Sequence, residues 1–237
     1  MKQRLDKTLF QRHLVTSRSQ AENFIKLGLV TANKIVVKTP SFLVDDRDVL
    51  EVTAPDRYVS RAGLKLASVA KKLSIDFRGK TVLDVGSSTG GFTDYALQHG
   101  TTKVIAVDVG TNQLHPSLHG DPRIELHEQT DIRKFATDSP IDIIVIDVSF
   151  ISLRDILPSV AKLANRQTQI AAMVKPQFEA GREQINKGVI KNDTVRRAVL
   201  KDFEIWAQKH FKIQDKADSD IAGAKGNLER FYLLKNI

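Results

Sequence analysis

Two side chains able to do chemistry stand at strand ends, where an ordinary β-sheet has no need of them. Asp147 ends the apolar run IDIIVID, and Lys175 ends the run IAAMV immediately before Pro176. If both runs are parallel strands, both side chains point into one crevice at the carboxyl edge of the sheet. Lys65 upstream and Glu229, at the start of the last predicted strand, can join them there. Such a set of amines and carboxylates can orient a substrate and move a proton.

A glycine-rich loop stands upstream of this pair. The stretch TVLDVGSSTGGF, residues 81–92, is typical of a buried strand, a tight turn and the start of a helix. Its glycines are Gly86, Gly90 and Gly91, and Ser88 occupies the place of the second glycine in the dinucleotide fingerprint G-x-G-x-x-G. The loop therefore fits an adenosyl ligand without a pyrophosphate better than NAD, which disfavours an NAD-dependent oxidoreductase.

Two acids beyond the loop are candidates for holding such a ligand. Asp108 follows the second predicted strand, 22 residues after Gly86, where an acid accepts hydrogen bonds from ribose hydroxyls. Asp131 is a candidate acceptor for an adenine amino group and equally a candidate N-cap for a short helix over 132–135. The predicted cofactor-binding set is Asp84, Gly86, Ser87, Ser88, Thr89, Gly90, Gly91, Phe92, Asp108, Val109, Asp131, Ile132 and Asp147.

The elements that must position these residues alternate between strand and helix. Several predicted strands are continuous apolar runs, which is typical of a mostly parallel sheet covered on both faces. We therefore predict a doubly wound, Rossmann-like α/β domain over 61–237, with its ligand at the carboxyl ends of the strands. The predicted strands are 81–85, 103–108, 124–127, 141–147, 168–174, 212–217 and 229–234. One predicted helix begins near Ser60, and the others are 92–98, 153–163 and 194–210.

Residues 1–54 are predicted to form a separate small α+β domain, followed by a linker over 55–60. Leu5, Leu9 and Phe10 recur at helical spacing. A second helix begins with a capping box at Ser17 and Gln20. The remaining expectations are an apolar face of Ala21, Phe24 and Ile25, a helix stop at Gly28, and strands over 34–37 and 49–52.

Positive charge is concentrated in this first domain. Residues 1–44 contain eight Lys/Arg and two Asp/Glu, so they hold +6 of the chain's net charge of +8. A concentrated basic segment favours a polyanionic partner such as RNA, although a solvated surface gives the same composition.

Composition limits the other classes. The chain has no cysteine, which excludes disulfides and thiolate metal sites, and its six histidines show no metal-ligand spacing, so we expect no metal. The N-terminus lacks a signal peptide core, and no apolar run approaches the roughly 20 residues that span a bilayer. We expect a cytoplasmic protein with no membrane partner.

The N-terminal strings RLDKTL and SRSQAENFIKLGLV resemble the alpha-L RNA-binding module of several pseudouridine synthases and of tyrosyl-tRNA synthetases. The resemblance implies phosphate contacts, which fix affinity and orientation more than sequence preference. The predicted RNA-binding residues are Arg4, Lys7, Arg12, Arg18, Lys26 and Lys38, with Arg61 at the start of the second domain.

Five ordered motifs resemble the TlyA family, whose catalytic half is similar to the FtsJ-type RNA ribose methyltransferases. They are DVGSSTGGFTD (84–94), AVDVG (106–110), VIDVSFISL (145–153), VKPQFEAGRE (174–183) and GNLER (226–230). The resemblance implies S-adenosylmethionine as methyl donor and a ribosomal RNA ribose 2′-hydroxyl, usually of cytidine, as acceptor. It also implies ribosomal RNA or ribosomal subunits as partners. The catalytic tetrad it implies is Lys65, Asp147, Lys175 and Glu229.

The tetrad suits methyl transfer to an alcohol, because the main task is to hold the ribose oxygen in line with the donor. Burial and a second ammonium favour the neutral form of an amine, so Lys175 could accept the hydroxyl proton. In a second version Lys175 only aligns the oxygen. Two other classes stay open at this stage: a non-catalytic RNA-binding assembly factor and a membrane-active haemolysin.

Among the aromatic residues, Tyr58, Phe178 and Trp206 are candidates for stacking on a base. Trp206 fits the core beneath the helix over 194–210 better, and Phe178 is the candidate closest to Lys175.

Overall fold

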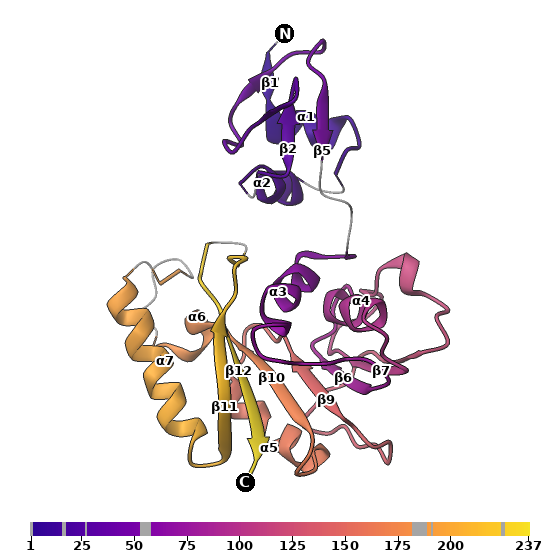
Figure 1. Cartoon of the computed structure of the whole chain (residues 1–237), viewed down its shortest axis with the longest axis vertical. Coiled ribbons are helices and arrows are strands. Elements are labelled where there is room, and N and C mark those ends of the chain that lie inside the picture. Colours follow the sequence, from indigo (N-terminus) through magenta and orange to yellow (C-terminus); the bar gives the residue numbers. More distant parts are fainter. Residues whose placement is uncertain are drawn as a thin grey trace. The chain divides into compact units, whose positions relative to one another are not determined.

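The chain divides into two compact units, Met1–Arg57 and Tyr58–Ile237, each described here by itself (Figure 1). The computed structural model describes residues 2–15, 18–26, 28–52, 58–181, 189–190, 192–223 and 226–237. The predicted cap residue Ser17 and residues 55–57 of the predicted linker lie outside this part.

Unit 1 packs two short helices with small antiparallel strands. Its elements are β1 (Gln3–Arg4), α1 (Leu5–Gln11), α2 (Arg18–Lys26), β2 (Val30–Ala32), β3 (Ile35–Val36), β4 (Leu43–Val44) and β5 (Leu50–Val52). Leu5 and Leu9 of α1 and Ala21, Phe24 and Ile25 of α2 are buried in one core, as their spacing predicted.

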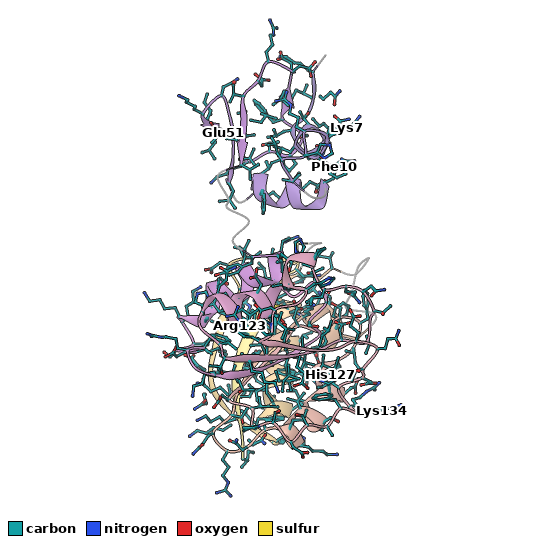
Figure 2. All side chains as sticks on the ribbon, turned by 90° about the vertical axis from the view of Figure 1, so that its right-hand side faces the viewer. Lys7, Phe10, Glu51, Arg123, His127 and Lys134 are labelled. Atoms are coloured by element: carbon teal, nitrogen blue, oxygen red, sulfur yellow. The ribbon has the colours of Figure 1, made fainter. Side chains whose placement is uncertain are left out.

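Two residues of unit 1, Phe10 and Gly28, test the predicted helix face and the predicted helix end. Phe10 was expected in the apolar stripe, but it is 44% exposed because it lies one helical step off the line through Leu5 and Leu9. Figure 2 labels it on α1, together with Lys7 three residues earlier. Gly28 ends α2 as predicted, with φ +72 and an N–H that donates to Ile25 O at 2.9 Å.

Among the described residues, unit 2 holds a seven-stranded sheet in the order β11-β12-β10-β9-β6-β7-β8. From β10 to β8 the neighbours are parallel, whereas β12 is antiparallel to both β10 and β11. The strands are β6 (Thr81–Val85), β7 (Lys103–Val107), β8 (Ile124–His127), β9 (Ile143–Ile146), β10 (Gln169–Val174), β11 (Phe211–Asp218) and β12 (Arg230–Asn236). The predicted doubly wound α/β fold is confirmed.

Helices cover both faces of this sheet (Figure 1). They are α3 (Arg61–Ala70), α4 (Gly91–Gln98), α5 (Leu153–Leu163), α6 (Pro176–Glu179) and α7 (Asp193–Ala207), with a 3-10 turn η1 (Pro116–Leu118). Neighbouring residues of a strand face opposite sides, so Val82 packs in the core under α3 and α4 while Leu83 packs in the core under α5 and α7. Trp206 is half-buried against that second core, which supports its predicted packing role.

Two glycines allow α3 to approach α4 closely. A Cβ on Gly63 would lie 2.9 Å from the carbonyl oxygen of Gly91, and a Cβ on Gly91 would lie 2.9 Å from Gly63 N. No real side chain tolerates such distances to backbone atoms. This contact fixes the position of α3, which carries Lys65.

Asp84 of β6 is a carboxyl group inside the sheet. It is 1% exposed, and Thr93 Oγ of α4 donates to its Oδ2 at 2.7 Å. Burial raises the pKa of Asp84 to about 7, and the nearby charges of Asp147 and Asp108 add to this rise while Thr93 opposes it. Burial therefore favours the protonated form of Asp84, whereas the Thr93 hydrogen bond that links strand and helix favours the carboxylate.

We predict that Asp84 makes the free energy of unfolding fall as the pH rises from about 4 to about 7. The folded state keeps a proton that the unfolded chain has lost, so the stability is fully present below the unfolded pKa of 3.8 and is lost as the pH rises through about 7. One group contributes a slope of roughly 1.4 kcal/mol per pH unit. Asp84→Asn should remove that slope from urea-unfolding free energies measured across this range. Asp76→Asn, at an exposed acid, should keep it, and equal slopes in wild type and Asp84→Asn would contradict the prediction.

Candidate active site

Asp147 and Lys175 meet at the carboxyl edge of the sheet, as their strand-end positions predicted. The parallel register puts Ile146 of β9 beside Ala172 of β10; Asp147 follows Ile146 directly, and Lys175 follows Ala172 by three residues. Lys175 Nζ lies 2.6 Å from Asp147 Oδ1 and donates to Ser149 Oγ at 2.7 Å. Both partners therefore come from the segment that directly follows β9. Lys175 is 9% exposed, so this pair holds it in a largely buried position.

Lys65 and Glu229 form a second ion pair at the same edge. The antiparallel register puts Arg230 of β12 opposite Val174 of β10, so Glu229 comes next to Lys175 when the register is continued. Lys65 Nζ of α3 lies 2.5 Å from Glu229 Oε2, and the two side chains are 11% and 3% exposed. The structure thus brings the four predicted catalytic residues to one edge as two buried ion pairs.

The segment that leads into Glu229 is tied to α3. Arg61 Nη2 donates to Ala222 O at 2.5 Å, and Lys72 Nζ donates to Asp220 Oδ1 at 2.8 Å. Arg61 is one of the predicted RNA-binding residues. Its guanidinium is half-buried and anchors this segment, because the segment folds back over the start of α3.

The glycine loop contacts Asp147 through its backbone. Gly86 has φ +80, and a Cβ there would lie 2.7 Å from the carbonyl oxygen of Asp147. The Gly86 N–H donates to Val107 O of β7 at 2.9 Å. Only glycine satisfies both the left-handed backbone and the close approach, so the loop and Asp147 are held in one fixed relation.

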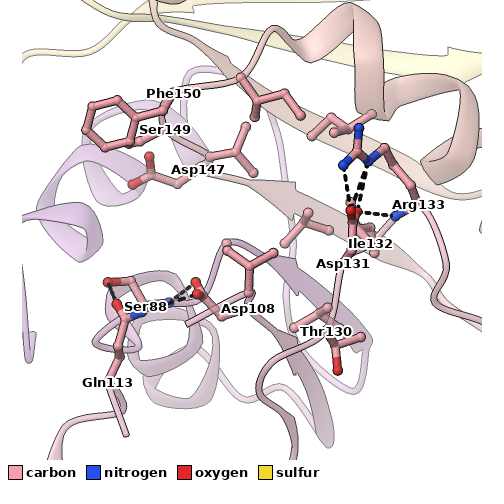
Figure 3. A pocket seen from close by; sticks show the side chains of 17 residues that line it. Ser88, Asp108, Gln113, Thr130, Asp131, Ile132, Arg133, Asp147, Ser149 and Phe150 are labelled. Carbon is pink, nitrogen blue, oxygen red and sulfur yellow. Dashed lines mark hydrogen bonds and ion pairs between the residues drawn. The ribbon is translucent and has the colours of Figure 1, made fainter. Parts of the chain in front are cut away.

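A cavity of about 460 Å³ opens between this loop and the residues after β9. Figure 3 shows Ser88, Asp108 and Gln113 on one side, Asp147 and Phe150 on the opposite side, and Asp131 with Arg133 at one end. Its size lies in the range of cofactor sites. The lining residues are Val85, Gly86, Ser88, Val107, Asp108, Val109, Gln113, Thr130, Asp131, Ile132, Arg133, Asp147, Val148, Ser149, Phe150, Ile151 and Ile156.

Asp108 connects β7 to the glycine loop. Its Oδ2 accepts from Ser88 N at 2.8 Å and its Oδ1 from Gly110 N at 2.7 Å. Gln113 Nε2 also donates to Oδ1, at 3.4 Å, so Oδ2 is the oxygen that can accept a further hydrogen bond. The carboxylate therefore lies in the cavity wall with its orientation already set.

Asp131 closes the far end of the cavity with Arg133. Arg133 Nη2 lies 2.6 Å from Asp131 Oδ2, and this hydrogen bond is the main reason why the pKa of Asp131 falls to about 2. The alternative prediction of a short helix over 132–135 is corrected: Lys134 N donates to Asp131 O at 2.8 Å in a single turn, with no helix after it.

Phe150 is the residue that sequence analysis missed. It lies three positions after Asp147, is 91% exposed and adopts φ +66, a backbone region that bulky residues rarely occupy. Its ring centroid lies 5.2 Å from that of Phe178, just beyond Lys175. Tyr58, another candidate for base stacking, is instead 6% exposed and packs on Tyr95 in the core.

The predicted cofactor set divides into residues that line the cavity and residues that support it. Gly86, Ser88, Asp108, Val109, Asp131, Ile132 and Asp147 line it. The side chain of Phe92 is 2% exposed and packs on Phe231, which corrects its prediction as a cofactor contact. The remaining members lie in or behind the loop and are Asp84, Ser87, Thr89, Gly90 and Gly91.

The basic residues of unit 1 are partly organised by acids. Asp6 is fully buried, and it accepts from Arg4 Nε at 2.9 Å and from Arg18 Nη2 at 2.9 Å. The Arg4 hydrogen bond is the main reason why the pKa of Asp6 falls to about 2. Both guanidinium side chains stay about half exposed, at 48% and 54%.

The other predicted RNA-binding residues of unit 1 differ in exposure. Arg12 is half-buried and donates to the carbonyl oxygens of Asp48 and Asp45, so its guanidinium is largely occupied. The exposed ones are Lys7, Lys26 and Lys38.

Comparison with known protein families and proteins identifies the family of this chain. The FtsJ-like methyltransferase model matches residues 58–236, and the S4 domain model matches residues 3–50. The chain is 35% identical to the 16S/23S rRNA (cytidine-2′-O)-methyltransferase TlyA of Mycobacterium tuberculosis, over 98% of this chain and 89% of that protein. It is 42% identical to the 23S rRNA (cytidine-2′-O)-methyltransferase TlyA of Campylobacter jejuni, over 74% and 70%.

A solved structure supports the same assignment. A Streptococcus thermophilus protein described as a hemolysin candidate superposes with a TM-score of 0.76 at 38% identity, covering 99% of this chain and 88% of that chain. The family expected from the five sequence motifs is thereby confirmed. With a methyltransferase model matching most of its length and TlyA proteins similar along nearly all of it, this chain belongs to the FtsJ-like methyltransferase family.

Proposed function

We propose that this protein transfers a methyl group from S-adenosylmethionine to a ribose 2′-hydroxyl of ribosomal RNA, with cytidine as the target nucleotide. The observation that carries the proposal is the pair of buried ion pairs, Lys175–Asp147 and Lys65–Glu229, at the mouth of a cofactor-sized cavity. The names of the TlyA relatives support the cytidine and the ribosomal RNA.

The residues around the cavity fit S-adenosylmethionine. The cavity combines an apolar wall of Val85, Val107 and Ile132 with the Asp108 carboxylate, whose Oδ2 can accept a further hydrogen bond from a ribose hydroxyl. Asp108 would hold the ribose hydroxyls, and Asp131 the adenine amino group. When bound, the cofactor supplies an electrophilic methyl group on a sulfonium.

Lys175 is the residue best suited to act on the ribose hydroxyl. Its amine is held by an ion pair with Asp147 and a hydrogen bond to Ser149, so the remaining side of the nitrogen has a defined direction. The amine can orient the oxygen or accept its proton from the same position. Glu229 and Lys65 would hold the opposite side of the site, and orientation of this kind supplies much of the rate enhancement.

Phe150 would stack on the base of the target nucleotide. An exposed ring beside Phe178 offers a face for an unstacked base, which is how proteins commonly recognise single-stranded RNA. Its backbone conformation costs about 1–2 kcal/mol. A strained, solvent-exposed aromatic side chain at the mouth of a site is better explained by substrate contact than by packing.

Unit 1 would hold the RNA through its exposed basic residues. Arg4 and Arg18 are half exposed and fixed by Asp6, which lowers the entropy cost of meeting a phosphate. Lys7, Lys26 and Lys38 would add further phosphate contacts.

The alternatives have less support. A non-catalytic RNA-binding factor would not need two buried ion pairs at the cavity mouth, because buried charges are costly. A membrane-active haemolysin would act on a bilayer, and no helix in the described part of the chain has the length and apolar character to cross one.

We predict that the purified protein, incubated with S-adenosylmethionine and unmodified ribosomal subunits, creates a new 2′-O-methylcytidine that mass-spectrometric mapping detects. Lys175→Ala should lose at least about 100-fold in rate while its S-adenosylmethionine affinity stays within a few fold, because the amine acts on the acceptor. No new methylated position in either subunit would refute the proposed function, and near-normal turnover in Lys175→Ala would remove Lys175 from its role.

We predict that Phe150→Ala raises KM for the RNA by about tenfold or more, because stacking on one base contributes roughly 1–3 kcal/mol. Phe150→Tyr keeps the ring and should stay close to wild type. Steady-state methylation at varied RNA concentration measures both variants. An unchanged KM in Phe150→Ala would show that the ring does not meet the base.

We predict that Arg18→Gln weakens RNA binding and lowers the slope of log affinity against log salt by about 1, as loss of one phosphate contact requires. Arg47→Gln is the matched control, since Arg47 is 94% exposed and outside the predicted set. Filter binding at several salt concentrations gives both slopes. Equal slopes in the two variants would contradict a phosphate contact by Arg18.

A further inference from the structure

One buried carboxylate near the active site has no part in the chemistry described above. Glu179, the last residue of α6, has a side chain that is 1% exposed. Ser152 Oγ donates to its Oε2 at 2.6 Å, and Leu153 N donates to its Oε1 at 2.7 Å. Its partners therefore lie 27 and 26 residues away in the chain, at the start of α5.

The position of Glu179 in the chain shows which two segments this contact joins. Glu179 follows Lys175 by four residues, and Ser152 follows Asp147 by five. The Glu179–Ser152 contact and the Lys175–Asp147 ion pair therefore join the same two segments, 147–152 and 175–179, at both ends. Phe150 and Phe178 belong to these two segments and pack on each other, with their ring centroids 5.2 Å apart.

An ordinary helix cap does not account for this arrangement. The start of α5 already has a local cap, since Ser152 Oγ accepts from Arg154 N at 3.1 Å. Glu179 adds a second acceptor from another element, at the cost of burying a carboxylate. That cost is offset by its two hydrogen bonds and by an ion pair with Arg154, whose Nε lies 3.6 Å from Glu179 Oε2. The same contacts hold two loops that carry reactive groups in a fixed relation to each other.

We propose that Glu179 is a positioning residue for methyl transfer. Its carboxylate braces the segment that carries Asp147, Ser149 and Phe150 against the strand end that carries Lys175. It touches neither substrate nor cofactor and acts by keeping the Lys175 amine and the Phe150 ring in a fixed position relative to each other. This inference rests on the proposed function for its kinetic consequence, whereas the brace itself is a property of the fold.

Kinetics of Glu179→Ala and Glu179→Gln test the proposal. Glu179→Ala should lower kcat by about ten- to a hundredfold, since displacement by 1 Å can cost about 100-fold. Its S-adenosylmethionine affinity, measured by calorimetry, should stay within a few fold. Glu179→Gln should recover most of the rate, because its amide can donate to Ser152 Oγ while its oxygen still accepts from Leu153 N.

Thr168→Ala is the matched control. Thr168 is 1% exposed, and its hydroxyl donates to Ile141 O at 2.7 Å, so it joins the chain before β9 to the chain before β10 at the opposite edge of the sheet. This variant should lose stability without losing kcat. If Glu179→Ala behaves in the same way, Glu179 is only a structural cap and the proposal fails.

Hydrogen exchange at the Leu153 amide separates this proposal from the proposed function. Glu179→Ala should lose protection at Leu153, and Glu179→Gln should keep it, whether or not any RNA is methylated. Unchanged protection in Glu179→Ala overturns the brace. If wild type methylates neither subunit, the proposed function fails while the exchange result still decides the brace. If Glu179→Ala does not fold, Ser152→Ala, which removes one of the two hydrogen bonds, is judged by the same measurements.

Discussion

The site depends on the requirement that charges removed from water must keep their partners. Lys175–Asp147 and Lys65–Glu229 are buried ion pairs, and losing one member of such a pair costs about 3–5 kcal/mol. The surrounding elements are arranged to prevent that loss. The parallel register of β9 and β10 sets the first pair, the antiparallel β12 brings Glu229 beside it, and the contact of Gly63 with Gly91 fixes the helix that supplies Lys65.

The cofactor cavity and the catalytic edge are coupled through backbone atoms. Gly86 lies against the carbonyl of Asp147, so the loop that would hold the adenosyl group cannot shift without moving the carboxylate that pairs with Lys175. Asp108 holds the other side of the same loop through Ser88 N. The glycine loop and the Lys175–Asp147 pair are thus held in one fixed relation, as the proposed alignment of cofactor and acceptor requires.

Local patterns in the sequence predicted much of this fold, because buried parallel strands are continuous apolar runs and a strand-end acid or amine stands out after them. The tetrad and the glycine loop follow from that logic. Sequence could not identify Arg61 as an anchor, since its partner Ala222 O lies 161 residues away. Nor could it separate Phe92, which packs in the core, from Phe150, which faces solvent. Both are apolar residues within a motif, and only tertiary packing distinguishes them.

Phe150 illustrates how evolutionary change would act on this site. A glycine at φ +66 would relieve the backbone and leave the exposed position without a large apolar surface. Selection for folding stability alone would therefore favour glycine over phenylalanine at this position. If Phe150 stacks on the substrate as proposed, this position is one where activity and stability trade off.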